Sequence, residues 1–153
     1  MAVRKILKDG EPNLRKKSKP VTEFNERLWT LFDDLKDTLK SVQGLGLAAP
    51  QVNVLRRAVI VCLDGEHVEM ANPQVLLSEG ELLDNEGCLS VGYCRGMVKR
   101  PAKVTVSYFD RNGNKCEITR ENYQARCILH EIDHLDGILF VDKMVKRVEI
   151  NNK

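Results

Sequence analysis

Apolar residues recur at helical spacing near the N-terminus of the chain. The repeating positions are Phe24, Leu28, Leu31, Phe32, Leu35, Leu39 and Val42. Steps of three and four residues place these side chains on one face of a helix of about five turns. Thr22 precedes the run as a candidate N-cap, and Gly44 follows it as a residue that ends helices. The pattern predicts a long N-terminal helix that packs against a core.

Shorter apolar or alternating runs after residue 52 predict strands. These runs cover residues 58–63, 68–70, 74–77, 103–110 and 115–119. The uninterrupted apolar run AVIVCL at 58–63 is typical of a buried strand. The turn sequence Asn112-Gly113 separates the last two runs, which indicates an antiparallel hairpin.

The C-terminal third predicts a second helix and a short final strand. The helix covers residues 121–135 and ends at Gly137, and the strand covers residues 139–142. The polar tail 143–153 predicts a frayed helix or no regular structure. Together these elements predict one α+β domain over residues 1–153. Its mostly antiparallel strands pack around the second helix, and the long N-terminal helix adds to the core.

Composition narrows the class of protein. The chain has 153 residues, of which 42% are hydrophobic and 30% charged, as in a globular domain with one core. A net charge of +2 argues against direct reading of nucleic acid. No apolar run approaches the roughly 20 residues that cross a bilayer, so no membrane partner is expected. The start MAVRKILKDGEP becomes charged before any signal-like region, which predicts a cytoplasmic protein.

Five cysteines, an odd number, predict metal binding or simple burial rather than a disulfide framework. The candidate metal site begins with the sequence HEIDH at 130–134. On a helix, His130 and His134 lie on one face and can bind the same metal ion. Glu131 lies beside the first ligand and can take a proton from water at the metal. Two coincidental surface histidines are the alternative, but the same helix is apolar at several positions.

The third protein ligand is not given by this motif. In the pattern HExxHxxGxxH a third histidine follows, but Phe140 stands at that position here. Glu149 is the only glutamate after His134, and it lies in the polar tail. The third ligand is therefore expected upstream of the motif, and a cysteine is chemically suitable.

Two upstream segments complete a resemblance to a known family. They are GLGLAAPQ at 44–51 and EGCLS at 86–90. With HEIDH, they resemble the three motifs of the peptide deformylases, in the same order and over nearly the whole chain. This resemblance implies a metal-dependent hydrolase that removes the formyl group from the N-terminal formylmethionine of newly made polypeptides.

The resemblance also implies the roles of individual residues. Cys88 is similar to the family's third metal ligand, beside His130 and His134, with water in the fourth position. Glu131 resembles the general acid and base. The Gln51 side-chain amide and the Leu89 backbone N–H resemble the donors that stabilise the oxyanion.

Further residues are expected to contact the peptide substrate. These are Leu45, Gly46, Arg95, Tyr123, Arg126 and Cys127. An extended peptide can pair with the backbone of Leu45 and Gly46. Cys127 is either a pocket residue or a buried core thiol, and Arg95 either contacts the peptide or is a solvated loop residue. Glu86 and Arg100 are expected to form an ion pair nearby.

The resemblance implies one divalent metal ion per chain, natively Fe(II), although zinc, nickel or cobalt also suit these ligands. The expected partners are formylmethionyl nascent chains. The basic tail suggests a transient contact with the ribosome, through Lys143, Lys146, Arg147 and Lys153. The protein is expected to be a monomer.

The chain departs from the family pattern in two places. Many members read EGCLS-x-P-G, but Gly92-Tyr93 stands here in place of Pro-Gly. Asn53 stands where a glycine often follows the first motif. Three rival interpretations stay open. They are a small metallopeptidase, which would cleave internal peptide bonds, a non-catalytic metal-binding domain, and a module that binds formylated N-termini without releasing formate.

Overall fold

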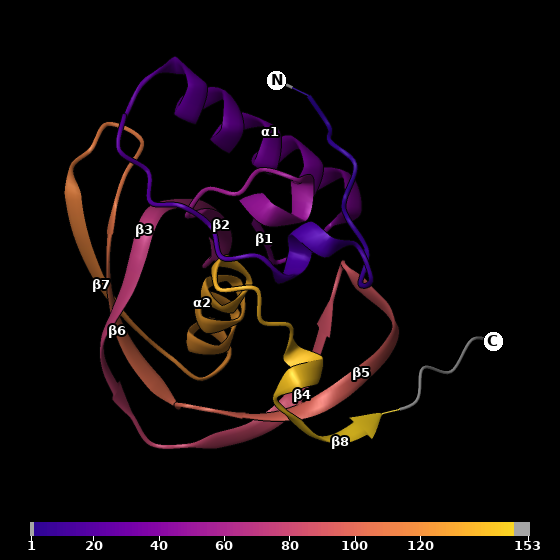
Figure 1. Cartoon of the computed structure of the whole chain (residues 1–153). Coiled ribbons are helices and arrows are strands. Elements are labelled where there is room, and N and C mark those ends of the chain that lie inside the picture. Colours follow the sequence, from indigo (N-terminus) through magenta and orange to yellow (C-terminus); the bar gives the residue numbers. More distant parts are fainter. Residues whose placement is uncertain (1, 149–153) are drawn as a thin grey trace.

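The computed structural model describes residues 2–148 and contains two α-helices and eight strands in that range (Figure 1). The helices are α1 (Glu26–Val42) and α2 (Asn122–Leu135). Short 3-10 helices are η1 (Pro12–Arg15), η2 (Ala49–Val52) and η3 (Phe140–Asp142). The strands are β1 (Gly46–Ala48), β2 (Ala58–Leu63), β3 (Glu66–Glu79), β4 (Leu82–Cys88), β5 (Val91–Arg100), β6 (Lys103–Phe109), β7 (Lys115–Glu121) and β8 (Met144–Val148).

The strands form two antiparallel sheets. One sheet has the order β1-β2-β3-β6-β7 and the other the order β4-β5-β8. Figure 1 shows α2 in the middle of the molecule, with the strands curving round it and α1 along one side. The predicted α+β class with mostly antiparallel strands is confirmed.

Strand β2 lies between the two helices, and this explains its uninterrupted apolar sequence. Successive side chains of a strand point to opposite faces. Ala58 and Ile60 pack in the core cluster that contains α1. Val59 and Val61 pack in a second cluster that contains α2. Both faces of β2 are therefore buried, and α2 is fixed against its inner face.

Helix α1 begins later than the sequence pattern predicted. Asn25 is the N-cap, and its side-chain oxygen accepts a hydrogen bond from the Arg27 N–H at 3.2 Å. Thr22 therefore lies before the helix. At the other end Gln43, with φ of 52°, adopts the left-handed conformation that ends the helix, one residue before Gly44.

Several predicted strand boundaries were wrong. The separate strands at 68–70 and 74–77 are one strand, β3, which passes Pro73 at a register shift where the missing N–H is tolerated. Residues 139–142, predicted as a strand, include the 3-10 helix η3. Strands β4 and β5 were not predicted, since the polar and glycine-containing sequence of β4 gives a weak pattern.

The tail also differs from its prediction. Residues 144–148 form β8, which pairs antiparallel with β5. Residues 149–153, which include Glu149 and Lys153, lie outside the described part of the chain. The single domain over residues 1–153 stays a prediction. Within 2–148, no helix is long and apolar enough to span a bilayer.

The contact between α1 and the sheet should dominate stability. Phe32 on α1 is fully buried, with 0% of its surface exposed. Phe32→Ala should lower the free energy of unfolding by about 3–5 kcal/mol, because it removes apolar contacts and leaves a cavity. Urea unfolding followed by circular dichroism measures this change. Leu77→Ala, at a side chain 64% exposed, is the control and should change it by less than about 0.5 kcal/mol. Equal losses of unfolding free energy in Phe32→Ala and Leu77→Ala would contradict the assignment of Phe32 to the core.

Candidate active site

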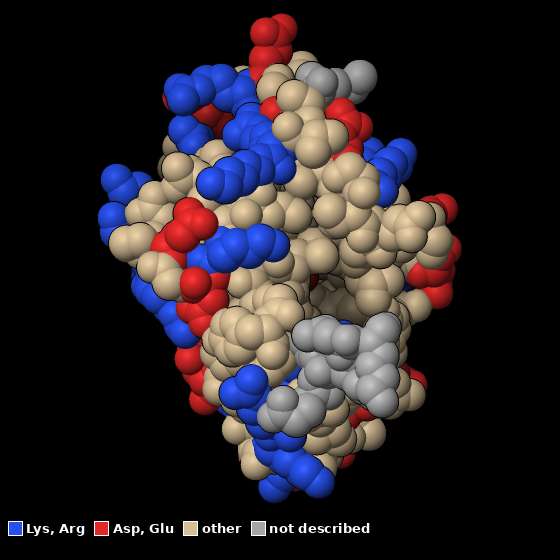
Figure 2. Space-filling model, turned by 90° about the vertical axis from the view of Figure 1, so that its right-hand side faces the viewer, with Lys and Arg blue, Asp and Glu red and all other residues tan. Residues whose placement is uncertain are grey.

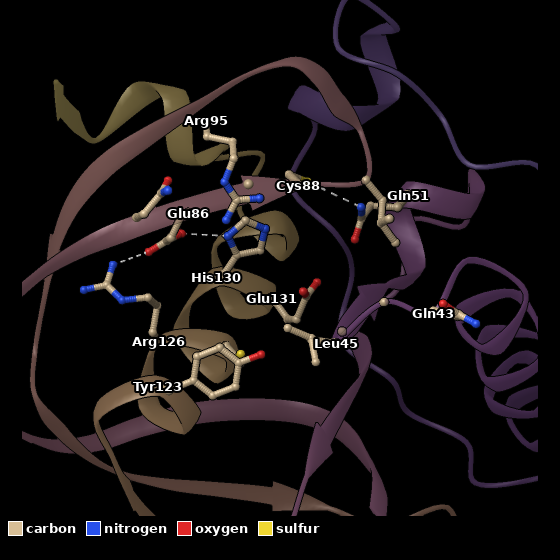
Figure 3. Close-up of a pocket in the computed structure, with 16 residues that line it drawn as sticks. Gln43, Leu45, Gln51, Glu86, Cys88, Arg95, Tyr123, Arg126, His130 and Glu131 are labelled. Carbon is tan, nitrogen blue, oxygen red and sulfur yellow. Dashed lines mark hydrogen bonds and ion pairs between the residues drawn. The ribbon is translucent and has the colours of Figure 1, made fainter. Parts of the chain in front are cut away.

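One cavity of about 330 Å³ brings the three sequence motifs together (Figure 3). Segments around β1 and η2, the end of β4, and helix α2 each contribute side chains to it. The predicted site residues that line this cavity are Leu45, Gly46, Gln51, Cys88, Leu89, Arg95, Tyr123, Arg126, Cys127, His130 and Glu131. His134 is not part of this lining; it lies one helical turn after His130 and is buried.

Cys88, His130 and His134 form a candidate metal site. One ligand atom from each residue lies within 4.8 Å of the other two. Cys88 Sγ is 3.4 Å from His134 Nε2. Tetrahedral bonds of about 2.0–2.3 Å to a metal place ligand atoms roughly 3.3–3.8 Å apart. The thiol and the two imidazoles therefore fit a single divalent metal ion.

The orientation of His130 and the charge state of His134 both suit this role. His130 Nδ1 donates a hydrogen bond to Glu86 Oε1 at 2.8 Å, which leaves its other ring nitrogen for the metal. Burial and the neighbouring His130 hold the pKa of His134 well below its ordinary value. The His134 ring is then neutral at pH 7, which is the form that binds metals.

Glu86 is itself fixed by a buried ionic network. Arg100 binds both of its carboxylate oxygens, as expected from the sequence, and Arg126 Nη1 donates to Oε2 at 2.6 Å. Burial acts to raise the pKa of Glu86, but the hydrogen bonds from His130 and Arg100 outweigh it and lower the pKa to about 2. Glu86 is therefore ionised at neutral pH and keeps His130 in one orientation.

Glu131 places a carboxylate at the cavity, beside the candidate metal site. The residue is only 5% exposed, and burial raises its pKa to about 7. Within residues 2–148, its Oε1 has no hydrogen-bond partner. The backbone of Gly46 approaches it so closely that a Cβ there would lie 2.6 Å from Glu131 Oε2. A carboxylate enclosed in this way is positioned to exchange a proton with a molecule in the cavity.

Gln51 directs its amide toward the thiol of Cys88. Gln51 Nε2 lies 3.7 Å from Cys88 Sγ and donates to Ser90 Oγ at 3.1 Å. Its Oε1 accepts a hydrogen bond from the Ala48 N–H at 2.9 Å, which fixes which end of the amide faces the cavity. The side chain is 1% exposed. It therefore presents a positioned N–H donor next to the candidate metal site.

The predicted substrate residues divide into two groups. Leu45 and Tyr123 are about half exposed at the cavity, and Cys127 lies near Tyr123 on α2. The Arg95 guanidinium packs against Gly87, where a Cβ would lie 2.5 Å from its Nη1. These side chains are accessible from the cavity or line its wall.

Arg126 also lines the cavity, but its side chain is bound within the protein. Its guanidinium is buried and donates to Glu86 and to the backbone carbonyls of Leu82 and Val98. The predicted contact with substrate stays a prediction, and the structure shows that this side chain joins α2 to β4 and β5. We therefore interpret Arg126 as support for the site.

Sequence reasoning missed two supporting features. Ser90 lies within the EGCLS motif but received no role, although its hydroxyl binds Gln51. The polar segment 7–9 also contacts this region through hydrogen bonds to Gln51, Leu89 and Ser90. No local pattern indicated the second feature, because a backbone contact between remote segments leaves no periodicity in the sequence.

Comparisons with known proteins agree with this geometry. The family model for polypeptide deformylase matches residues 3–149. A peptide deformylase of Caldanaerobacter subterraneus is 49% identical over 146 residues, covering 95% of this chain and 92% of that protein.

Solved structures give the same result. A peptide deformylase from Legionella pneumophila superposes with a TM-score of 0.91 at 45% identity, covering 94% of this chain and 86% of that one. A Met-Ala-Ser-bound peptide deformylase from Acinetobacter baumannii superposes with a TM-score of 0.90 at 34% identity, covering 94% and 99%. The chain therefore belongs to the peptide deformylase family, whose members are metal-dependent hydrolases that remove the N-formyl group from newly made polypeptides.

Proposed function

We propose that Cys88, His130 and His134 hold the catalytic metal ion and that Glu131 and Gln51 act on the formyl group beside it. The observation that carries this proposal is that Gln51, Cys88, His130 and Glu131 line one cavity. The ligand atom of His134 lies within 4.8 Å of those of Cys88 and His130. A bound divalent ion supplies Lewis acidity, which polarises a carbonyl and makes water more acidic. We infer Fe(II) as the native ion, and the thiolate and imidazole ligands also suit zinc, nickel or cobalt.

Glu131 performs the proton transfers of the reaction. Its carboxylate takes a proton from the water that attacks the formyl carbon. It then gives this proton to the amine nitrogen as the C–N bond breaks, which releases formate and a free N-terminus. The Gln51 amide and the Leu89 N–H donate hydrogen bonds to the carbonyl oxygen as negative charge develops there.

The peptide binds along the edge of β1. Strand β1 is the end strand of the five-stranded sheet, so its outer edge is free to pair with an extended chain at Leu45 and Gly46. Tyr123 and Cys127 form the wall that receives the methionine side chain, and Arg95 lies at the rim. The Acinetobacter relative was solved with Met-Ala-Ser bound, which supports a peptide beginning with methionine as the ligand.

Nascent chains are the proposed substrates, and we therefore infer a cytoplasmic location near the ribosome. The monomeric state stays a prediction. Lys and Arg side chains lie among Asp and Glu side chains on the face of the molecule where β8 ends beside the first half of β5 (Figure 2). We propose that this face gives a transient electrostatic contact with ribosomal RNA backbone rather than sequence-specific binding.

Replacing the proposed base should stop the chemistry and spare the metal. Glu131→Gln should lower kcat for formate release from formyl-Met-Ala-Ser by about 10²–10⁴-fold, because the amide cannot transfer the proton. Formate assay and elemental analysis of Fe(II)-loaded protein, prepared without oxygen, give both quantities. Glu66→Gln, at an exposed position, is the control and should retain activity. Full activity in Glu131→Gln at equal metal content would exclude Glu131 as the base.

Removal of the proposed thiolate ligand should release the metal. Cys88→Ser should weaken metal affinity at least about tenfold, since a neutral hydroxyl replaces an anionic ligand. Metal content after dialysis against a graded chelator series measures this change. Cys62→Ser, at another partly exposed cysteine that does not itself line the cavity, should retain its metal. An unchanged affinity in Cys88→Ser would place the third ligand elsewhere.

Charge reversal in β8 tests the ribosome contact. Lys146 is exposed, and Lys146→Glu should reduce co-sedimentation with ribosomes by a few fold at low salt and leave kcat on short peptides unchanged. Lys5→Glu, an exposed change of equal charge elsewhere, is the comparison. If both variants sediment like the original protein, the contact through β8 is wrong.

A further inference from the structure

An N-terminal segment, residues 7–9, ties together the two parts of the chain that carry the proposed oxyanion donors. The Leu7 N–H donates to the Gln51 carbonyl at 2.7 Å, and the Asp9 N–H donates to the Ser90 carbonyl at 2.8 Å. Gln51 and Ser90 are 39 positions apart in the sequence. Segment 7–9 therefore fixes the distance between η2 and the turn after Cys88.

The residue between these two contacts adds a third. Lys8 Nζ donates to the carbonyl of Leu89 at 2.8 Å. Leu89 is the residue whose backbone N–H is the second proposed oxyanion donor. Leu7, Lys8 and Asp9 thus each donate a hydrogen bond to one backbone carbonyl. The three acceptors are, in that order, the carbonyls of Gln51, Leu89 and Ser90.

A side-chain hydrogen bond fastens this segment. Tyr93 Oη donates to Asp9 Oδ2 at 2.6 Å, a charge-assisted bond. The bond to Asp9 is the largest cause that raises the pKa of Tyr93 to about 12, so the phenol keeps its proton at neutral pH. The Tyr93 ring also lies under the Arg147 guanidinium, whose Cζ is 6.0 Å from the ring centroid. Arg15 approaches the other Asp9 oxygen only at 3.8 Å.

The sequence at the start of β5, directly after the Cys88–Ser90 turn, creates a need for such a bond. Gly92 stands where many relatives have proline, and Tyr93 stands where they have glycine. Proline fixes its φ angle, whereas glycine has the largest backbone freedom of any residue. A Cβ at Gly92 would meet nothing within 4 Å, so a side chain at this position of β5 would have no packing partner. The Tyr93–Asp9 bond supplies a restraint from outside the turn.

We propose that the Tyr93–Asp9 hydrogen bond is a latch that holds segment 7–9 against η2 and the Cys88–Ser90 turn, and so positions both oxyanion donors. The proposal rests on the proposed function of Gln51 and Leu89. Tyr93 does not line the cavity, so it is a positioning residue. Oxyanion contacts strengthen in the transition state, and loosening them should therefore lower kcat more than it changes KM.

The first test separates the hydrogen bond from the bulk of the side chain. Tyr93→Phe keeps the ring beside Arg147 and removes the donor. It should lower kcat for formyl-Met-Ala-Ser by about 3- to 10-fold, with KM changed less than about twofold. Asp9→Leu should give a similar loss, whereas Asp9→Asn keeps an acceptor and should restore most of kcat. The Tyr93→Phe/Asp9→Leu double variant should lose no more than either single variant.

Hydrogen exchange gives a readout that does not need activity. Tyr93→Phe should speed amide exchange in peptides covering residues 7–9 and 88–93, while α1 and the β2 core keep their protection. Lys8→Met, which removes the bond to Leu89, should act in the same direction. Lys5→Met, an exposed lysine in the same segment of chain, is the matched control and should change neither kcat nor exchange.

The outcomes distinguish this latch from the proposed function. If the unsubstituted enzyme is inactive at correct metal content, the proposed function is overturned. Amide hydrogen exchange at residues 88–93 of Tyr93→Phe would still test the latch. Unchanged exchange in Tyr93→Phe would overturn the latch, as would multiplicative losses of kcat in the double variant. Equal changes in kcat and KM, with faster exchange over the whole chain, would show general destabilisation instead.

Discussion

The buried carboxylate of Glu86 is the interaction on which the site depends. It accepts hydrogen bonds from Arg100 on β5 and from Arg126 and His130 on α2. A buried carboxylate without partners costs several kcal/mol, so these three donors must reach it together. Their convergence fixes β4 and β5 against α2 and orients one proposed metal ligand. Glu86 lies two residues before Cys88, the last residue of β4, so the same contacts hold this end of β4 beside α2.

Helix α2 can carry polar ligands because the rest of its surface is covered by apolar packing. Strand β2 is buried on both faces, with α1 on one side and α2 on the other. The face of α2 that carries His130 and Glu131 is left for the cavity. Ligands on a helix held in this way cannot drift apart, and that rigidity is what a preorganised catalytic site requires.

Close backbone approach completes the geometry. Gly46 lets β1 pass directly beside Glu131, and Gly87 leaves room for the Arg95 guanidinium just before Cys88. Any larger side chain at Gly46 would displace the carboxylate. Asn53, which stands where relatives often have glycine, keeps the left-handed conformation that ends η2 with φ of 67°. Asparagine tolerates this conformation better than most residues, so this departure preserves the position of Gln51.

The sequence by itself determined the helices, the hairpin of β6 and β7, and the residues with metal chemistry. The helices, the hairpin and the pair His130 and His134 rest on local spacings, whereas Cys88 was assigned from the resemblance to a known family. Only the tertiary structure decided the strands β4, β5 and β8, the structural use of Arg126, and the contact of segment 7–9 with Gln51. These features depend on hydrogen bonds between segments remote in the chain. Such bonds form between backbone groups that every residue has, or between long side chains that can reach several partners. A local residue pattern therefore does not predict them.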